Sequence, residues 1–468
     1  MRSSLYHSLN HQLEPSDSRT QSQSTTGLAF WKRRKCRKCA RNHFLSDDDM
    51  SEDCLFLNIF MPSARTTELL PVIFWIHGGF FVSGSGKISN NRPDLLINEG
   101  VILVSINYRL GIFGYLSAED DILPGAVNVG LLLQTPLAKG LFSAAILESG
   151  NSLNLWARSK NSKSLTKQVA SVLKIEYNNT QELVDELQKI KWTDLNLISF
   201  TDFIVDAVLE NPSNGFALGP TTETGPNSVV NENIHEKLRT GDFNRVPVLT
   251  GFNSGEANLV IVFYDYARFY FWTFDWLPKK LVPVDMNADS QLLNIIGKEV
   301  QNFYFGLNSI TASKQLFINF LNDNEFVRPA NEFVRVLSKH TDTYFYRFSY
   351  VGQLPNVEKV QRELPGAVHT EELKYLFHSP SENPASASDL VTRQRMVKLW
   401  TNFAKYHNPT PTFDPLFQNI KWKPVNGDEI NFLNIDTDLQ MLTNPSERNM
   451  TFWKTIYDNY GYPPYDTY

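Results

Sequence analysis

The chain has 468 residues, with 44 lysines and arginines against 50 aspartates and glutamates, so its formal net charge is −6. This acidic balance argues against a nucleic-acid-binding protein, because such proteins carry a strongly basic surface. Hydrophobic residues make up 42% and aromatic residues 13% of the chain, which excludes disorder over most of its length. A chain this long can build a sizeable core without metal ions, and we expect neither a metal site nor a cofactor.

Membrane and targeting segments are not visible in the sequence. No run of about 18 apolar residues is present, and the densest stretch, Leu259–Leu277, is interrupted by Asp265, Arg268 and Asp275. The first residues, Met1–Pro15, lack the apolar stretch of a secretory signal peptide. We therefore expect no transmembrane segment, while the compartment and the oligomeric state stay open.

Residues 1–45 differ from the rest of the chain. They are rich in Ser, Gln, Arg and Lys, and we expect a disordered or aberrant segment followed by one domain over residues 46–468. The basic block Lys32–Arg41 resembles a nuclear-import or nucleic-acid patch, although a solvated tail is the simpler interpretation. A zinc site could be drawn from four side chains whose spacing fits no common finger, namely Cys36, Cys39, His43 and Cys54.

From Cys54 onward, apolar strands alternate with helical stretches. Strands are predicted at Cys54–Phe60, Pro71–Ile76, Val101–Asn107, Ala144–Leu147, Val246–Thr250 and Thr343–Phe348. Helices are predicted at Gly125–Gln134, Ser164–Leu173, Thr180–Ile190 and Val391–Tyr406. Such alternation predicts an α/β fold with a doubly wound, mostly parallel sheet.

The tripeptide His77-Gly78-Gly79 directly follows a predicted strand. Adjacent glycines allow two backbone N–H groups to turn toward a common point, where they can stabilise an oxyanion. A strand followed by this tripeptide is the oxyanion-loop pattern of esterases and lipases. A plain turn is the competing interpretation. With Gly84-Ser85-Gly86 behind the motif, both interpretations stay open, and Gly78 and Gly79 are the candidate oxyanion donors.

Longer blocks of the chain resemble the type-B carboxylesterases, the cholinesterase-like branch of the α/β-hydrolases, and look most like the insect general esterases. They lie in family order between about residues 51 and 455. The blocks are SEDCLFLN at 51–58, PVIFWIHGG at 71–79, NYRLG at 107–111, PLAKGLF at 136–142, GFNSGE at 251–256, GAVHTEEL at 366–373 and LWTNFA at 399–404.

This resemblance implies an α/β-hydrolase fold and a serine-hydrolase mechanism acting on small carboxylic esters. A serine attacks the ester carbonyl, a histidine takes its proton, and an acid orients the imidazole. Glu256 matches the acid of the family and His369 matches the base, in the expected chain order. Cys39 and Cys54 match its N-terminal disulfide loop. Members of the family are commonly secreted or lumenal.

The serine nucleophile is missing. The chain contains no Gly-x-Ser-x-Gly sequence, and the 36 residues of Tyr108–Ser143 must hold a crossover helix, a strand, the elbow and a second helix. A βαβ unit takes about 30 residues, and the second helix needs roughly 10 more. In the family, a Pro-Gly pair precedes the crossover helix and a Gly-Ala pair follows the elbow, and Pro124-Gly125-Ala126 fuses the two. We expect one central βα unit to be lost at Pro124/Gly125.

This loss predicts a chain that is inactive as written. The lost segment carries the attacking oxygen and one oxyanion donor. Its strand belongs near the centre of the sheet, so its neighbours would lose a ladder partner and an apolar face would lack cover. A truncated isoform or gene product is the simplest origin. The alternative is a non-catalytic hydrolase-fold protein for ligand binding or adhesion, against which the retained Glu256 and His369 argue.

Two further features have competing interpretations. Asn178 and Asn449 begin glycosylation sequons that would be used only in the secretory pathway, and a chain this long contains a couple by chance. Seven aromatic residues close to the candidate acid could line a substrate pocket or could pack in the core or a lid, namely Phe263, Tyr264, Tyr266, Phe269, Tyr270, Phe271 and Trp272.

Overall fold

The computed structural model of the chain describes a defined set of residues. These are 21–23, 28–31, 38–39, 50–63, 67–87, 91–116, 125–159, 162–196, 198, 219–223, 228–229, 234–310, 312–379, 382–463 and 465. Most of the basic block, together with Cys36 and His43, lies outside them. Three short strands lie among the described residues before residue 46, and the division of the chain at residue 45 stays a prediction.

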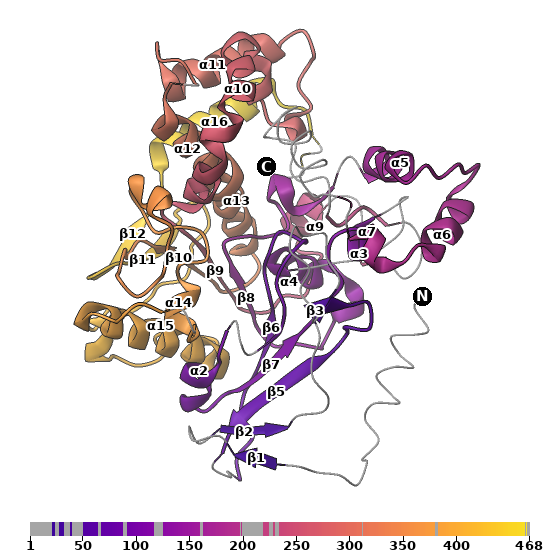
Figure 1. Cartoon of the computed structure of the whole chain (residues 1–468). Coiled ribbons are helices and arrows are strands. Elements are labelled where there is room, and N and C mark those ends of the chain that lie inside the picture. Colours follow the sequence, from indigo (N-terminus) through magenta and orange to yellow (C-terminus); the bar gives the residue numbers. More distant parts are fainter. Residues whose placement is uncertain are drawn as a thin grey trace.

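The first sheet contains five strands among the described residues, in the order β1-β2-β5-β7-β6 (Figure 1). Their bounds are Gln21–Gln23 (β1), Leu28–Trp31 (β2), Leu57–Pro62 (β5), Ile102–Ile106 (β7) and Val72–Ile76 (β6). Strands β1, β2, β5 and β7 pair antiparallel, whereas β6 runs parallel to β7. The sheet therefore ends on β6, the strand that leads into His77-Gly78-Gly79.

The second sheet also contains five described strands, in the order β12-β11-β10-β9-β8. Their bounds are Leu439–Thr443 (β12), Asn431–Ile435 (β11), Thr343–Phe348 (β10), Val248–Asn253 (β9) and Ala145–Glu148 (β8). All its pairings are parallel except that of β11 with β12. A short parallel pair, Lys38–Cys39 (β3) with Met50–Ser51 (β4), stands apart.

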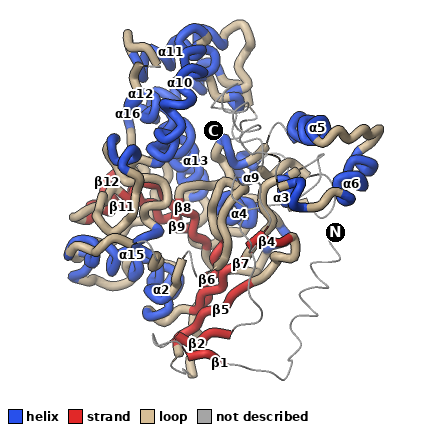
Figure 2. Tube along the Cα trace, viewed as in Figure 1, coloured by secondary structure: helices blue, strands red, loops and turns tan. Residues whose placement is uncertain are grey.

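Helices pack on both sides of the second sheet, as the doubly wound prediction requires (Figure 2). Helices α2 (Asp94–Asn98), α14 (Leu373–Leu376) and α15 (Ala387–Tyr406) share one core with strands of both sheets. Helices α4 (Gly125–Gln134), α9 (Ile234–Thr240) and α13 (Arg328–Leu337) form the other core with β8 and β9. The site described below lies where β9 and β10 end.

A separate helical group lies at the top of Figure 1. It contains α10 (Ile261–Trp276), α11 (Leu293–Phe305), α12 (Lys314–Asn322) and α16 (Glu447–Tyr460). These helices have an apolar core of their own. A π-helical turn over Asp323–Val327 joins α12 to α13. The remaining helices are α3 (Ile112–Tyr115), α5 (Ser162–Val172), α6 (Thr180–Lys189) and α7 (Trp192–Leu195).

The six predicted strands and four predicted helices all form; Thr343–Phe348 and Gly125–Gln134 have the predicted bounds, and the ends of the others are shifted. The strand predicted from Cys54 begins at Leu57, because a turn in which Cys54 and Phe56 donate backbone hydrogen bonds precedes it. The helix predicted from Val391 begins at Ala387, because Ser386 and Asp389 form a capping box. Strands β11 and β12 and the helical group were not predicted.

Candidate active site

Glu256 and His369 come from distant parts of the chain and form a direct contact. Glu256 begins the turn that follows β9, and His369 lies in the loop between β10 and α14. A backbone bridge between Gly255 and Val368 brings the two segments together, and the Gly255 N–H donates to the Ala367 carbonyl at 2.8 Å. His369 Nδ1 lies 2.6 Å from Glu256 Oε2. This contact orients the imidazole, because a carboxylate accepts the Nδ1 proton.

The carboxylate of Glu256 is fully buried, whereas the His369 side chain is 18% exposed. The Asn253 N–H donates to Glu256 Oε1 at 2.7 Å, so the second carboxylate oxygen is also held. Burial alone would lower the pKa of His369, but the charge of Glu256 and its hydrogen bond outweigh burial and raise it. The Glu256 carboxylate therefore stabilises the imidazolium form of His369 relative to a histidine in water.

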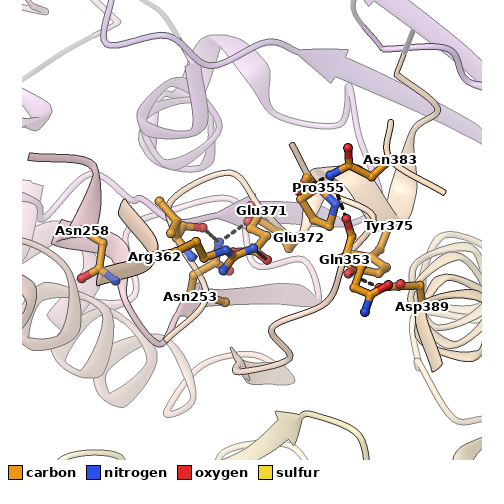
Figure 3. Close-up of polar contacts among 12 residues, drawn as sticks. Asn253, Asn258, Gln353, Pro355, Arg362, Glu371, Glu372, Tyr375, Asn383 and Asp389 are labelled. Carbon is orange, nitrogen blue, oxygen red and sulfur yellow. Dashed lines mark hydrogen bonds and ion pairs between the residues drawn. The ribbon is translucent and has the colours of Figure 1, made fainter. Parts of the chain in front are cut away.

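The loop that carries His369 is braced on two sides (Figure 3). Asn253 Nδ2 donates to the Val368 carbonyl at 2.7 Å and to the carboxylate of Glu372. Glu371 accepts the Val368 N–H at 2.8 Å and is held by Arg362 through bonds of 2.6 and 3.0 Å. Because Val368 before His369 and the two glutamates that follow Thr370 are anchored, the ring of His369 has little freedom to leave Glu256.

The helix that follows this loop is anchored as well. Tyr375 of α14 donates its hydroxyl to Asp389 of α15 at 2.9 Å, the second group of contacts in Figure 3. Nearby, Asn383 Nδ2 donates to the carbonyls of Gln353 at 3.0 Å and Pro355 at 3.4 Å. The segment after His369 is thus tied to the core beneath the sheet.

Two further carboxyl groups lie near the pair, the buried Glu372 and the half-buried Glu148, and sequence reasoning missed both. Burial and the neighbouring Glu256 charge raise the pKa of Glu372 to about 7, against the lowering effect of the Asn253 hydrogen bond. Burial and the Glu372 charge raise the pKa of Glu148 to about 8, although Trp400 Nε1 donates to Glu148 at 2.7 Å. Glu148 ends β8, and a lone acid at the end of an apolar strand carries no signal in the sequence.

Aromatic rings flank His369. Phe80 lies 5.4 Å and Phe326 5.7 Å from the imidazole, measured between ring centroids. Trp156 contacts both of them, at 6.1 and 5.8 Å, and its Nε1 donates to the Glu325 carbonyl at 3.2 Å. Phe80 follows directly on Gly79, so the glycine motif and His369 lie in one site.

The backbone N–H groups of Gly78 and Gly79 donate no hydrogen bond to any described residue. Gly79 has a φ of +126° and its carbonyl accepts bonds from the N–H groups of Val82 and Ser83, so the chain turns sharply there. The His77 ring stacks on the Tyr108 ring with their centroids 4.2 Å apart. The Tyr108 hydroxyl donates a hydrogen bond to the main-chain carbonyl of His77 at 2.6 Å. The loop is therefore fixed at its base and presents two N–H donors.

A nucleophile is not found beside His369 in the described part of the chain, where no serine hydroxyl is hydrogen-bonded to the imidazole. Ser149, directly after β8, has a left-handed φ of 58° and a buried hydroxyl without a partner among the described residues. Residues 117–124, which precede α4, lie outside the described part. The sequence pattern Gly-x-Ser-x-Gly does not occur in the chain.

The sequence profile described as the Carboxylesterase family matches residues 15–132 and 123–453. The chain belongs to this family. It is 28% identical over 449 residues to juvenile hormone esterase of Tribolium castaneum, a match covering 82% of this chain and 75% of that protein. It is also 28% identical over 464 residues to carboxylesterase 1D of Mus musculus, covering 87% and 77%.

A solved structure supports the fold assignment. The crystal structure of juvenile hormone esterase from Manduca sexta, with OTFP covalently attached, superposes with a TM-score of 0.74 at 23% identity and covers 90% of this chain and 88% of that one. At this identity the likeness establishes the fold alone. The predicted α/β-hydrolase fold is confirmed.

Other predicted residues of this carboxylesterase-family chain have defined places. Cys39 and Cys54 form a disulfide, so neither is a free thiolate for zinc. Asn178 is exposed, whereas Asn449 lies half-buried in the first turn of α16. Of the aromatic segment, Tyr264 packs in the core of the helical group and Trp272 is exposed. None of the described helices is long and apolar enough to cross a membrane.

Proposed function

We propose that the chain is a Ser–His–Glu ester hydrolase that keeps its acid, its base and two oxyanion donors but lacks its nucleophile, and is inactive as written. The hydrogen bond between Glu256 and His369, beside the Gly78-Gly79 loop, carries this proposal. Its substrates would be small carboxylic esters, the compounds after which carboxylesterase 1D is named. No cofactor takes part in such acyl transfer.

The retained residues have defined tasks in this mechanism. Glu256 holds Nδ1 of His369 and leaves Nε2 to accept the proton of an attacking hydroxyl. The Glu256 carboxylate, which raises the pKa of His369, stabilises the imidazolium that forms when His369 takes up that proton. Gly78 and Gly79 would donate their N–H groups to the developing oxyanion, where preorganised donors are worth several kcal/mol, on the order of 3 each.

Three observations support loss of a βα unit at Pro124/Gly125. The two matches to the family profile overlap at residues 123–132, the point at which the unit would belong. Among the described strands, β6 lies at one edge of the first sheet and β8 at one edge of the second, and each edge lacks a partner strand. Only residues 107–144 separate β7 from β8. A strand between β6 and β8 would join the two sheets into one.

The proposal is tested by comparing the purified chain with an insertion variant. The variant receives, between Pro124 and Gly125, the corresponding segment of the Tribolium castaneum juvenile hormone esterase. We expect the chain itself to hydrolyse p-nitrophenyl acetate at least about 10⁴-fold more slowly than the variant and to take up no fluorophosphonate label.

The matched control is the same insertion with its elbow serine replaced by alanine, which we expect to be as inactive as the original chain. Ordinary esterase turnover by the original chain would contradict its inactivity. A folded but inactive insertion variant would contradict the roles of Glu256 and His369, and saturable ester binding by that variant would favour the non-catalytic alternative.

A further inference from the structure

One face of the β5–β7–β6 sheet carries eight apolar side chains in adjoining rows. Strand pairing places Ile59 beside Val104 and Val104 beside Phe74, and it aligns the neighbouring residues in the same way. We call this surface the open face; it contains Leu57, Ile59, Val72, Phe74, Ile76, Ile102, Val104 and Ile106. Four of its members are 42–57% exposed, namely Leu57, Ile59, Val72 and Phe74. An apolar surface of this kind marks an interaction site.

The opposite face of the same sheet is buried. Phe60 and Leu103 point into the core that contains α2 and α15, and Ile73 and Trp75 pack against that core. This core also contains Leu249 and Tyr346 of the second sheet, so it runs beneath both sheets. The open face therefore lies on the side on which α4, α9 and α13 cover the second sheet.

The strand edges beside the open face are also available. Among the described strands, β6 ends the first sheet and β8 ends the second, and each is parallel to its one neighbour. A strand that entered between them and continued this parallel pairing would be joined to the preceding chain through a crossover helix on a sheet face. The open face is the side of the first sheet left for such a helix.

We propose that the open face and the edges of β6 and β8 form one receptor site for a carboxylesterase helix–strand segment of about 30 residues, which can bind as a separate chain. The apolar side of an amphipathic helix would cover Phe74 and its neighbours, and the strand would add to both edges. The inference rests on the proposed function, because it takes the lost βα unit as the occupant. The relatives are longer: this chain's match covers 75% of the Tribolium esterase.

The test measures binding without any substrate. A fluorescein-labelled peptide carrying the helix–strand segment of the Tribolium esterase, with its serine replaced by alanine, is titrated with the purified chain, and fluorescence anisotropy is recorded. We expect saturable binding that Phe74→Lys weakens about tenfold or more, because the charge would be buried. Ile59→Lys, on β5 of the same face, should have the same effect.

The matched control is Leu307→Lys, which places the same charge on a fully exposed leucine in the helical group and should leave binding unchanged. Circular dichroism checks that all variants fold. Absent binding, or binding that both face variants leave unchanged, would overturn the proposal. A third result would also overturn the proposal: light scattering shows a dimer, Phe74→Lys dissociates this dimer, and no peptide binds. A second copy of the chain would then occupy the open face. Peptide binding with an inactive insertion variant would instead refute the proposed function alone.

Discussion

The imidazole of His369 meets a buried carboxylate on one side and two aromatic rings on the others. Burial in such surroundings works against a charged imidazole, yet the adjacent Glu256 carboxylate reverses the balance. The sequence identified both partners, because each lies in a block that resembles the family. It did not identify Asn253, which holds Glu256 through its N–H and the His369 loop through its side chain.

Substituting Glu256→Gln should lower the pKa of His369. The charge that favours the imidazolium disappears, and burial then dominates. The titration midpoint of the His369 ring in NMR spectra should fall by about one pH unit or more. This readout needs no catalytic activity. The exposed Glu429→Gln is the control and should leave the midpoint unchanged; an unchanged midpoint in Glu256→Gln would contradict the assignment.

Asn178 and Asn449 should differ as glycan acceptors. Asn178 is exposed before α6, whereas Asn449 Nδ2 donates to the buried Asp323 at 2.5 Å. A glycan on Asn449 would break that bond and displace α16, so folded protein should carry glycan on Asn178 alone. With a secretion leader in insect cells, Asn178→Gln should abolish the mass shift on glycosidase treatment and Asn449→Gln should not. The reverse result would refute this.

The loop after β6 has different steric requirements at its two glycine positions. The sequence indicated that the glycine pair forms a turn or an oxyanion loop. It did not indicate which of the two glycines the turn requires. A Cβ on Gly79 would lie 2.2 Å from the Ser83 carbonyl oxygen at a φ of +126°, whereas a Cβ on Gly78 would meet nothing within 4 Å. The loop thus tolerates a side chain at one position and excludes it at the next.

Gly79→Ala should reduce the free energy of unfolding by about 1–3 kcal/mol or more, because it adds backbone strain and a clash. Gly78→Ala is the matched control, and its cost should stay within about 0.5 kcal/mol, since the added methyl group meets open space. Urea unfolding followed by fluorescence measures both. Equal losses in the two variants would show that the loop differs from the one described.

Across the whole molecule, one core keeps the two sheets together although no ladder joins them among the described strands. Trp400 of α15 donates a hydrogen bond to Glu148 at the end of β8. The charge of Glu372 in the His369 loop contributes to the raised pKa of Glu148. Residues up to 252 positions apart in the chain thus share one acidic cluster, and its protonation should influence the stability of the whole fold.

Global stability should therefore decrease as the pH rises from about 5 to 8. The pKa of Glu148 is raised from 4.5 to about 8 in the folded chain, so over this range the native state binds a proton that the unfolded state has lost. The stability that this proton contributes is fully present below the pKa of Glu148 in the unfolded chain. It is lost as the pH rises through the pKa of Glu148 in the folded chain. Glu148→Gln can keep the Trp400 bond and should flatten this dependence in urea unfolding, while Glu429→Gln should not; an unchanged slope would contradict the raised pKa.

The sequence by itself predicted the fold class and the family, which are confirmed, because these depend on local patterns along the chain. The roles of Glu256 as acid and His369 as base and the loss of the elbow also come from the sequence, and they stay predictions. Only the tertiary structure decided that Glu256 and His369 touch, that Asn253 and Arg362 brace their loop, and that the open face is uncovered. These features arise from contacts between residues distant in the chain. Strand register, which sets the open face, depends on pairing partners that no local pattern specifies.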